Sequence, residues 1–127
     1  MQSLTIDTGM KEYLINNRAV LRFNPGDPNL YHRFFAAAPQ LDTLDAELTE
    51  QLKALPAEPD DARAERGLAL LTDYDHRIKA LLTEIFGGEN DFDKVLEGVN
   101  LAGTGANGKR VVQNLLDALT PILQDGA

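Results

Sequence analysis

The chain has 127 residues, enough for one domain with a hydrophobic core but too few for two independent domains. Its formal net charge of −8 repels phosphate backbones and anionic lipid surfaces, so we expect neither a nucleic acid nor a membrane as a partner. The sequence contains no Cys, which excludes disulfide bonds, thiolate zinc sites and cysteine catalysis.

The pattern of residues 3–23 predicts short antiparallel strands. Apolar side chains recur at every second position within three stretches, at Leu4, Ile6, Tyr13, Ile15, Ala19, Leu21 and Phe23. Turn residues at 7–9 and 16–17 separate these stretches, so we expect two or three strands. Because a lone hairpin is marginal in water, its apolar face should lie on the helices or pair with another chain. Its edge can accept a strand from a partner.

A first helix is predicted over residues 28–55. Asp27 is placed to cap its free backbone amides, and Pro28 supplies the fixed φ of a first helical position. Apolar residues then recur at helical spacing, at Leu30, Phe34, Ala37, Leu41, Leu44, Leu48 and Leu55, with Gln51 as a polar interruption. Pro39 lies within this pattern and predicts a kink or short break near Ala38.

The central helix, predicted over residues 61–86, organises the rest of the chain. An acidic connector, residues 56–60, joins it to the first helix. Its apolar residues are three and four positions apart, at Leu71, Tyr74, Ile78, Leu81 and Ile85. We expect the charged residues of the same stretch to point away from this seam, namely Asp73, Asp75, Arg77, Lys79 and Glu84. Two apolar seams of this kind predict an αα-hairpin with a shallow, left-handed crossing.

Beyond a pair of glycines that ends the central helix, a short helix is predicted over residues 91–97. Either Asn90 or Asp91 can cap it. Residues 98–108 include four glycines and are predicted to form a mobile loop.

The last helix is predicted over residues 109–123, with Pro121 distorting its final turns. The fold class is therefore α+β and mainly α-helical. A small N-terminal antiparallel hairpin or sheet should precede a long αα-hairpin and two shorter helices, all within one domain of residues 1–127.

The segment Gly103-Thr104-Gly105-Ala106-Asn107-Gly108-Lys109 matches the spacing of two phosphate-binding motifs. The context of both motifs is missing. A phosphate loop needs Ser or Thr after the Lys, where this chain has Arg110, and a dinucleotide fold needs a βαβ unit of about 30 residues. We therefore interpret the segment as a hinge before the last helix and predict no cofactor.

The histidines are His32 and His76, and Ser3 is the single serine. Asp73 and His76 share a helix face, which is half of a metal or acid–base pair, but the sequence has no second cluster of this kind. We predict no metal site, no catalytic residue and no enzymatic activity. Because no window approaches 18 apolar residues and the N-terminus lacks a basic region followed by an apolar run, we expect a cytosolic protein.

Three segments, taken in order, resemble a family of small proteins encoded in the tail-gene modules of long-tailed bacteriophages and prophages. The segments are FNPGDPNLYHRFF at 23–35, DYDHRIKALLTEIFGGENDFDKVLEGVN at 73–100 and NLLDALTPIL at 114–123. The resemblance spans nearly the whole chain and is closest to the tail assembly chaperones. Its motifs are packing and capping patterns, so no family residue is carried over as a binding site.

The resemblance implies a non-enzymatic protein of the host bacterial cytoplasm, whose many copies coat the tape measure protein until tail tube subunits replace them. A longer, frameshifted form is also typical of that family. We expect a homo-oligomer whose partners are the tape measure protein and possibly the tail tube protein. The alternatives are a small structural or connector component of the phage tail, and a cytosolic helical adaptor unrelated to phage. Our hypothesis for the contact surface is the apolar seam of the last helix, at Val112, Leu115, Leu116 and Leu119.

Overall fold

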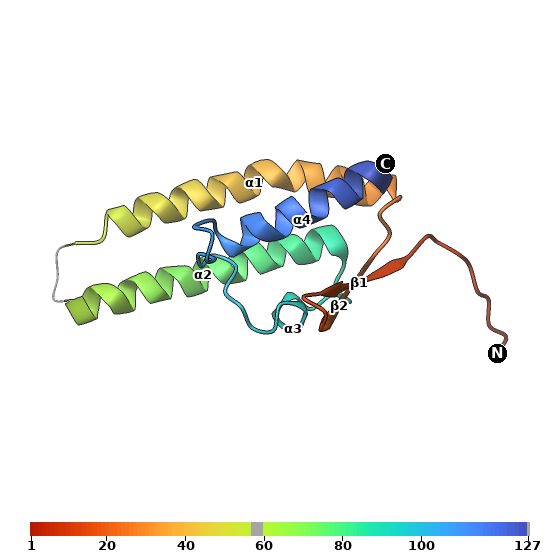
Figure 1. Ribbon diagram of the computed structural model, residues 1–127, viewed down its shortest axis with the longest axis horizontal. Helices are drawn as coiled ribbons and strands as arrows, with labels where there is room; N and C mark the ends of the chain where they lie inside the picture. The colour runs from red at the N-terminus through yellow and green to blue at the C-terminus, as the bar shows by residue number, and fades with distance from the viewer. Residues whose placement is uncertain (57–59, 127) are drawn as a thin grey trace.

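The computed structural model describes residues 1–56 and 60–126 and contains a small sheet followed by helices. In chain order the elements are β1 (Lys11–Ile15), β2 (Ala19–Phe23), α1 (Pro28–Lys53), α2 (Asp60–Phe86), α3 (Phe92–Val95) and α4 (Val111–Gly126). Figure 1 shows α1 and α2 side by side, with α4 running along the pair and the hairpin near one end. The predicted α+β, mainly helical fold is thus confirmed. Residues 57–59 of the predicted connector lie outside the described residues.

Most of the apolar residues that spacing predicted for the seam between α1 and α2 are buried, and Leu44, Leu71 and Leu81 are partly buried. The buried side chains of this seam are Leu30, Phe34, Ala37, Leu41, Leu48, Tyr74, Ile78 and Ile85. The polar interruption, Gln51, donates from Nε2 to the Tyr74 hydroxyl at 2.8 Å, and that hydroxyl lies 3.4 Å from the Glu47 carboxylate. Burial, with the negative charge of Glu47, raises the pKa of Tyr74. Gln51 therefore provides a hydrogen-bond partner for the buried hydroxyl of Tyr74.

The prediction near Ala38 was a kink or a short break, and helix α1 runs through Pro39 without a break. A proline removes one intrahelical hydrogen bond, but Phe34, Ala37 and Leu41 on either side of it are all buried in the same core. Their burial outweighs the lost bond. The hydroxyl of Thr43 also donates to the Pro39 carbonyl at 3.0 Å, one turn away.

The sheet has two strands, paired antiparallel in the register Lys11↔Phe23. A turn through Asn16 and Asn17, with φ of 53° and 62°, joins them. Phe23 connects the sheet to the helices, because its ring lies 4.8 Å from that of Tyr13 and 5.2 Å from that of Phe86.

Of the two or three strands predicted within residues 3–23, two are formed. Residues 3–7, which contain the alternating Leu4 and Ile6, form no strand. Leu4 and Ile6 are 90% and 74% exposed. In the described part of the chain, the sheet consists of β1 and β2 alone. The backbone of residues 3–7 therefore forms no hydrogen bonds with a neighbouring strand. Alternation of apolar residues predicts a strand only where a partner is available.

Helix α3 is shorter than the predicted 91–97. Of the two candidate caps, Asp91 is the one used, and its carboxylate accepts from the amides of Asp93 and Lys94. The helix ends at Val95, and Glu97 has a φ of 53°, in the left-handed region that a helix cannot continue through.

Within residues 98–108, the part around Leu101 is packed against the core, which the prediction of a mobile loop did not foresee. Leu101 and Ala102 are fully buried. Asn100 accepts hydrogen bonds from the amides of Ala102 and Gly103 and donates to the Leu71 carbonyl on α2 at 3.2 Å. The glycine content suggested flexibility, whereas the two apolar residues within the segment anchor it. Helix α4 then begins at Val111 and continues through Pro121 to Gly126.

Candidate functional site

Helix α4 carries the four residues that we predicted to bind a partner, and it has a cavity on each side. Val112 and Leu116 line a pocket shared with α1. Leu115 and Leu119 line a groove shared with β1. Val112, Leu115 and Leu119 are buried in the chain's own core, and Leu116 is partly buried. Partner binding by these residues stays a prediction, and Leu116 is the member that is accessible without moving α4.

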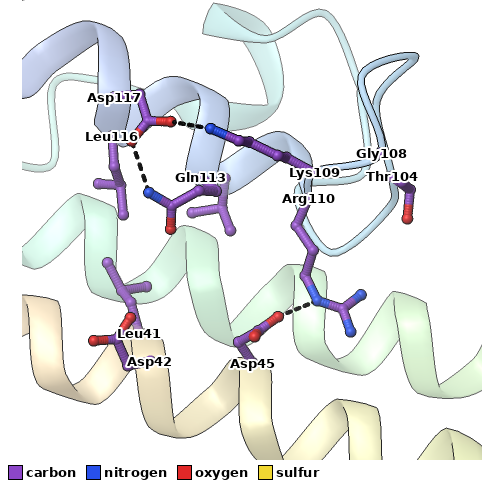
Figure 2. Close-up of a pocket in the computed structure, with 11 residues that line it drawn as sticks. Leu41, Asp42, Asp45, Thr104, Gly108, Lys109, Arg110, Gln113, Leu116 and Asp117 are labelled. Carbon is purple, nitrogen blue, oxygen red and sulfur yellow. Dashed lines mark hydrogen bonds and ion pairs between the residues drawn. The ribbon is translucent and has the colours of Figure 1, made fainter.

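The pocket between α1 and α4, called here the α1–α4 pocket, has a volume of about 590 Å³. In Figure 2, Leu41 on α1 and Leu116 on α4 point toward each other across it. The apolar residues are surrounded by charged ones from both helices and from the turn before α4, namely Asp42, Asp45, Lys109, Arg110 and Asp117. An apolar floor with a charged rim is typical of a surface that binds a protein segment.

Arg110 joins the turn before α4 to α1. Its guanidinium forms an ion pair with Asp45, donates to the Thr49 hydroxyl at 2.9 Å and donates to the Ala102 carbonyl at 2.8 Å. The ion pair with Asp45 is drawn in Figure 2. A planar guanidinium suits this arrangement because its donors diverge in a fixed geometry. Arg110 therefore shapes one end of the α1–α4 pocket.

Asp117 forms the opposite rim of the pocket. Its carboxylate accepts from Gln113 at 2.8 Å and lies 3.3 Å from the Lys109 ammonium. The hydrogen bond from Gln113, helped by Lys109, lowers the pKa of Asp117. The rim thus carries a carboxylate that is ionised at neutral pH.

The glycine-rich segment that matches phosphate-binding motifs is closed on itself. The amide of Gly105 donates to the Lys109 carbonyl at 2.7 Å, and the amide of Gly108 donates to the Gly105 carbonyl at 3.0 Å. Thr104 and Arg110 form a bridge between the two sides of this turn. A phosphate cradle needs several backbone amides aimed at one ligand, whereas these two are already bonded within the turn.

The groove between β1 and α4, called here the β1–α4 groove, has a volume of about 360 Å³. Its lining is mainly apolar and comes from Tyr13, Leu14, Ile15, Asn16, Leu96, Val111, Asn114, Leu115, Ala118, Leu119 and Ile122. One wall is therefore a continuous stretch of strand and the other is one face of a helix.

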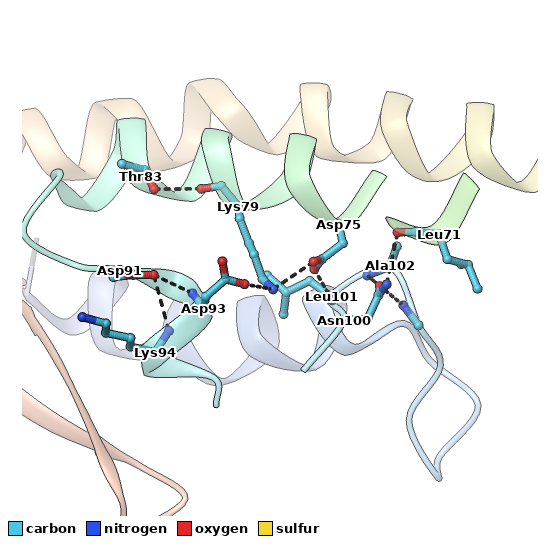
Figure 3. Close-up of polar contacts among 11 residues, drawn as sticks. Leu71, Asp75, Lys79, Thr83, Asp91, Asp93, Lys94, Asn100, Leu101 and Ala102 are labelled. Carbon is cyan, nitrogen blue, oxygen red and sulfur yellow. Dashed lines mark hydrogen bonds and ion pairs between the residues drawn. The ribbon is translucent and has the colours of Figure 1, made fainter. Parts of the chain in front are cut away.

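Figure 3 shows a buried polar cluster on α2 that the sequence prediction missed. The prediction placed Asp75 and Lys79 away from the apolar seam and gave them no partner. The exposed fractions of these residues are 7% and 8%. The Lys79 ammonium lies 2.9 Å from the Asp75 carboxylate and 2.6 Å from that of Asp93, and Asp75 also accepts from the Leu101 amide at 2.7 Å. The signal that could have revealed the cluster is a second stripe on α2, at Asp75, Lys79, Leu82 and Phe86.

The contacts within the cluster favour the charged forms of Lys79 and Asp93. Burial acts to lower the pKa of Lys79, but hydrogen bonds to Asp93 and Asp75 outweigh it and raise that pKa. The same hydrogen bond from Lys79 lowers the pKa of Asp93. The paired charges join α2 to α3 and to the buried segment around Leu101, so their role in this fold is structural.

Neither histidine belongs to a metal-binding group. His32 and His76 are exposed, and Asp73, which shares a helix face with His76, pairs with Arg77 at 2.9 Å. Within residues 1–56 and 60–126, no group of three or more His, Cys, Asp or Glu side chains is arranged to hold a metal ion. No helix in the same ranges is long and apolar enough to cross a bilayer.

The chain matches no model of a known protein family, no curated protein and no solved structure.

Proposed function

We propose that this chain is a non-enzymatic, tail assembly chaperone-like protein that binds the tape measure protein during tail morphogenesis. The observation that supports a binding function best is the α1–α4 pocket, in which Leu41 and Leu116 lie beneath a rim of charged residues. A helix inserted into such a pocket would place its apolar side chains on these leucines. The identity of the helix, a segment of the tape measure protein, comes from the family resemblance.

Charge favours a basic partner segment. The pocket rim contains Asp42, Asp45 and Asp117 against Lys109 and Arg110, and the whole chain carries a net charge of −8. Long-range attraction of this kind raises the association rate and selects partners by charge. We therefore expect the bound segment to carry Lys or Arg beside its apolar residues.

The test is co-expression with the tape measure protein that is encoded in the same tail-gene module. The amount of that product that stays soluble and co-purifies is measured, with and without this chain. Soluble complex only in the presence of this chain is the expected result. Equal insolubility in both cases would contradict the proposal.

Two variants locate the contact. Leu116→Asp should reduce co-purification at least tenfold, whereas Gln124→Asp, an exposed position on the same helix, should leave it unchanged. Circular dichroism shows whether Leu116→Asp remains folded. Asp42→Lys changes an exposed rim residue and should weaken the complex mainly at low salt. Full binding by both pocket variants would place the contact elsewhere.

A chaperone and a structural tail component differ in one simple respect. A chaperone is replaced during assembly and is absent from finished particles, whereas a connector remains. Mass spectrometry of purified virions should therefore lack peptides of this chain, and their presence at a fixed copy number would favour the structural alternative.

A further inference from the structure

The edge of β1 that faces away from β2 has free backbone groups. On β2, the amide and carbonyl of Arg22 are bonded by the side chain of Asn90, so they point away from β1. Arg22 is paired with Glu12. In an antiparallel pair, two opposite residues either both direct their backbone groups toward the partner strand or both direct them away from it. The amide and carbonyl of Glu12 therefore point outward, and so do those of Leu14, two residues along.

These outward groups have no backbone partner in the described part of the chain. Asn90 covers the edge of β2 at Arg22, whereas the edge of β1 borders the β1–α4 groove. On the opposite wall, α4 presents Leu115, Ala118, Leu119 and Ile122. A strand edge that faces an apolar helix across a groove is the geometry in which an added strand gains main-chain hydrogen bonds and pockets for alternate side chains.

The same chain contains a segment suited to this groove. Residues 3–7 have apolar side chains at alternate positions, and Leu4 and Ile6 are 90% and 74% exposed. A strand added beside β1 would turn both side chains to one face, toward α4, and leave Ser3, Thr5 and Asp7 on the other. Both side chains are therefore accessible to the groove of a neighbouring copy.

The structure directs this segment away from its own groove. The Thr8 carbonyl accepts a hydrogen bond from the side chain of Asn24, the residue that follows β2. Asp7 closes a turn onto the Gly9 amide at 2.9 Å. These contacts hold residues 7–9 beside Asn24, at the end of the hairpin. Figure 1 shows the first ten residues leading away from the body of the molecule, where a neighbour can bind them.

We propose that residues 3–7 of a second copy add to the free edge of β1 as a third strand, with Leu4 and Ile6 in the β1–α4 groove. Copies of the chain thus associate by exchanging their N-terminal segments. A reciprocal exchange closes a dimer, and a one-way exchange builds a chain of copies. The proposal uses the β1–α4 groove and is independent of partner binding in the α1–α4 pocket.

The test compares the mass of the full chain with that of Leu4→Asp/Ile6→Asp by sedimentation over a range of concentrations. Both substituted residues are exposed and outside the core, so the fold of the monomer should survive. The self-association constant should fall at least tenfold. Ser3→Asp/Thr5→Asp adds the same charge at the alternate positions and is the matched control, which should associate like the original chain.

A second experiment locates the contact. A synthetic peptide of residues 1–9 is added to the isotope-labelled Leu4→Asp/Ile6→Asp variant, and amide shifts are recorded by NMR. We expect shifts at Glu12, Leu14 and the groove face of α4. Leu14→Pro removes one outward amide and should abolish the binding.

Three results would overturn the proposal. The full chain could stay monomeric at every concentration, or the Leu4→Asp/Ile6→Asp variant could associate as strongly as the original chain. The segment could also occupy the groove of its own copy, which concentration-independent protection of the Glu12 and Leu14 amides in a monomer would reveal.

Discussion

The side chain of Asn90 occupies the outer edge of β2 by bonding both backbone groups of Arg22. Its Oδ1 accepts from the Arg22 amide at 3.0 Å, and its Nδ2 donates to the Arg22 carbonyl at 2.8 Å. The same Nδ2 donates to the Phe86 carbonyl at the end of α2 at 2.9 Å. One buried carboxamide thus imitates a neighbouring strand and joins the sheet to the central helix.

Asn90→Ala should lower the free energy of unfolding by about 1–3 kcal/mol, because it leaves the Arg22 amide and two carbonyls without partners. Urea denaturation measures the change. Hydrogen exchange of the Arg22 amide should also become faster.

The matched control is Glu89→Ala, which changes the exposed preceding residue and should alter stability by no more than about 0.5 kcal/mol. Equal stability of Asn90→Ala and Glu89→Ala would show that water replaces the carboxamide at no cost.

Lys79→Met should destabilise the fold by about 3–5 kcal/mol, since it leaves the buried carboxylate of Asp75 without its countercharge. The double variant Lys79→Met/Asp75→Asn should recover part of this loss. An Asn side chain is neutral and still accepts from the Leu101 amide. Thermal and urea unfolding measure both variants.

Lys94→Met, on the exposed side of α3, is the control for the loss of a lysine charge and should have little effect. If Lys79→Met were no less stable than Lys94→Met, the buried cluster would contribute nothing to the fold.

The pair of Lys79 and Asp93 predicts a specific dependence of stability on pH. Asp93 has a folded pKa below its ordinary value of 3.8, mainly through the hydrogen bond from Lys79, with His76 as a smaller influence. Its stabilisation is therefore present above about pH 4 and is lost as the pH falls through the folded pKa. Lys79 has a folded pKa above 10.5, so its stabilisation is present below that pH and is lost as the pH rises through the folded pKa.

The variant Asp93→Asn tests the predicted loss of stability at low pH. The original chain should be more stable than the variant at neutral pH, and the difference should shrink as the pH falls below 4. Urea unfolding at a series of pH values tests this. A difference that stays constant down to pH 2 would contradict the assigned pKa direction.

Leu119→Ala should destabilise the fold by about 2–5 kcal/mol, because Leu119 is buried between α4 and the rest of the core. Leu68→Ala removes the same atoms from a side chain that is 64% exposed and should change stability by no more than about 0.5 kcal/mol. Chemical denaturation distinguishes the two. Similar values would mean that α4 is not held in place as the structure shows.

Local patterns in the sequence predicted the elements that depend on neighbouring residues. The caps are examples, because Asp27 and Asp91 bond amides only two or three residues further along. The end of α2 is another, since Gly87 takes a φ of 98° and bonds back to Thr83. The seam of α1 and α2 also followed from spacing alone, because helical periodicity determines which side chains share a face.

The sites depended on contacts between distant parts of the chain. Lys79 was predicted to point away from the apolar seam, but α2 is covered on two sides, and α3 supplies Asp93 on the second side. The four predicted contact residues of α4 were placed on one seam, whereas the structure divides them between two cavities. Periodicity gives the faces of a helix but not the number of faces that neighbours cover.

The sequence by itself thus determined the types of the elements, their caps and the main apolar seam, since each of these depends on residues within a few turns of one another. Only the tertiary structure decided that the segment around Leu101 is buried, that Asp75 and Lys79 form a core ion pair, and that Asn90 covers the edge of β2 at Arg22. These outcomes depend on which surfaces meet, and the periodicity of one segment does not show which distant segment will cover it.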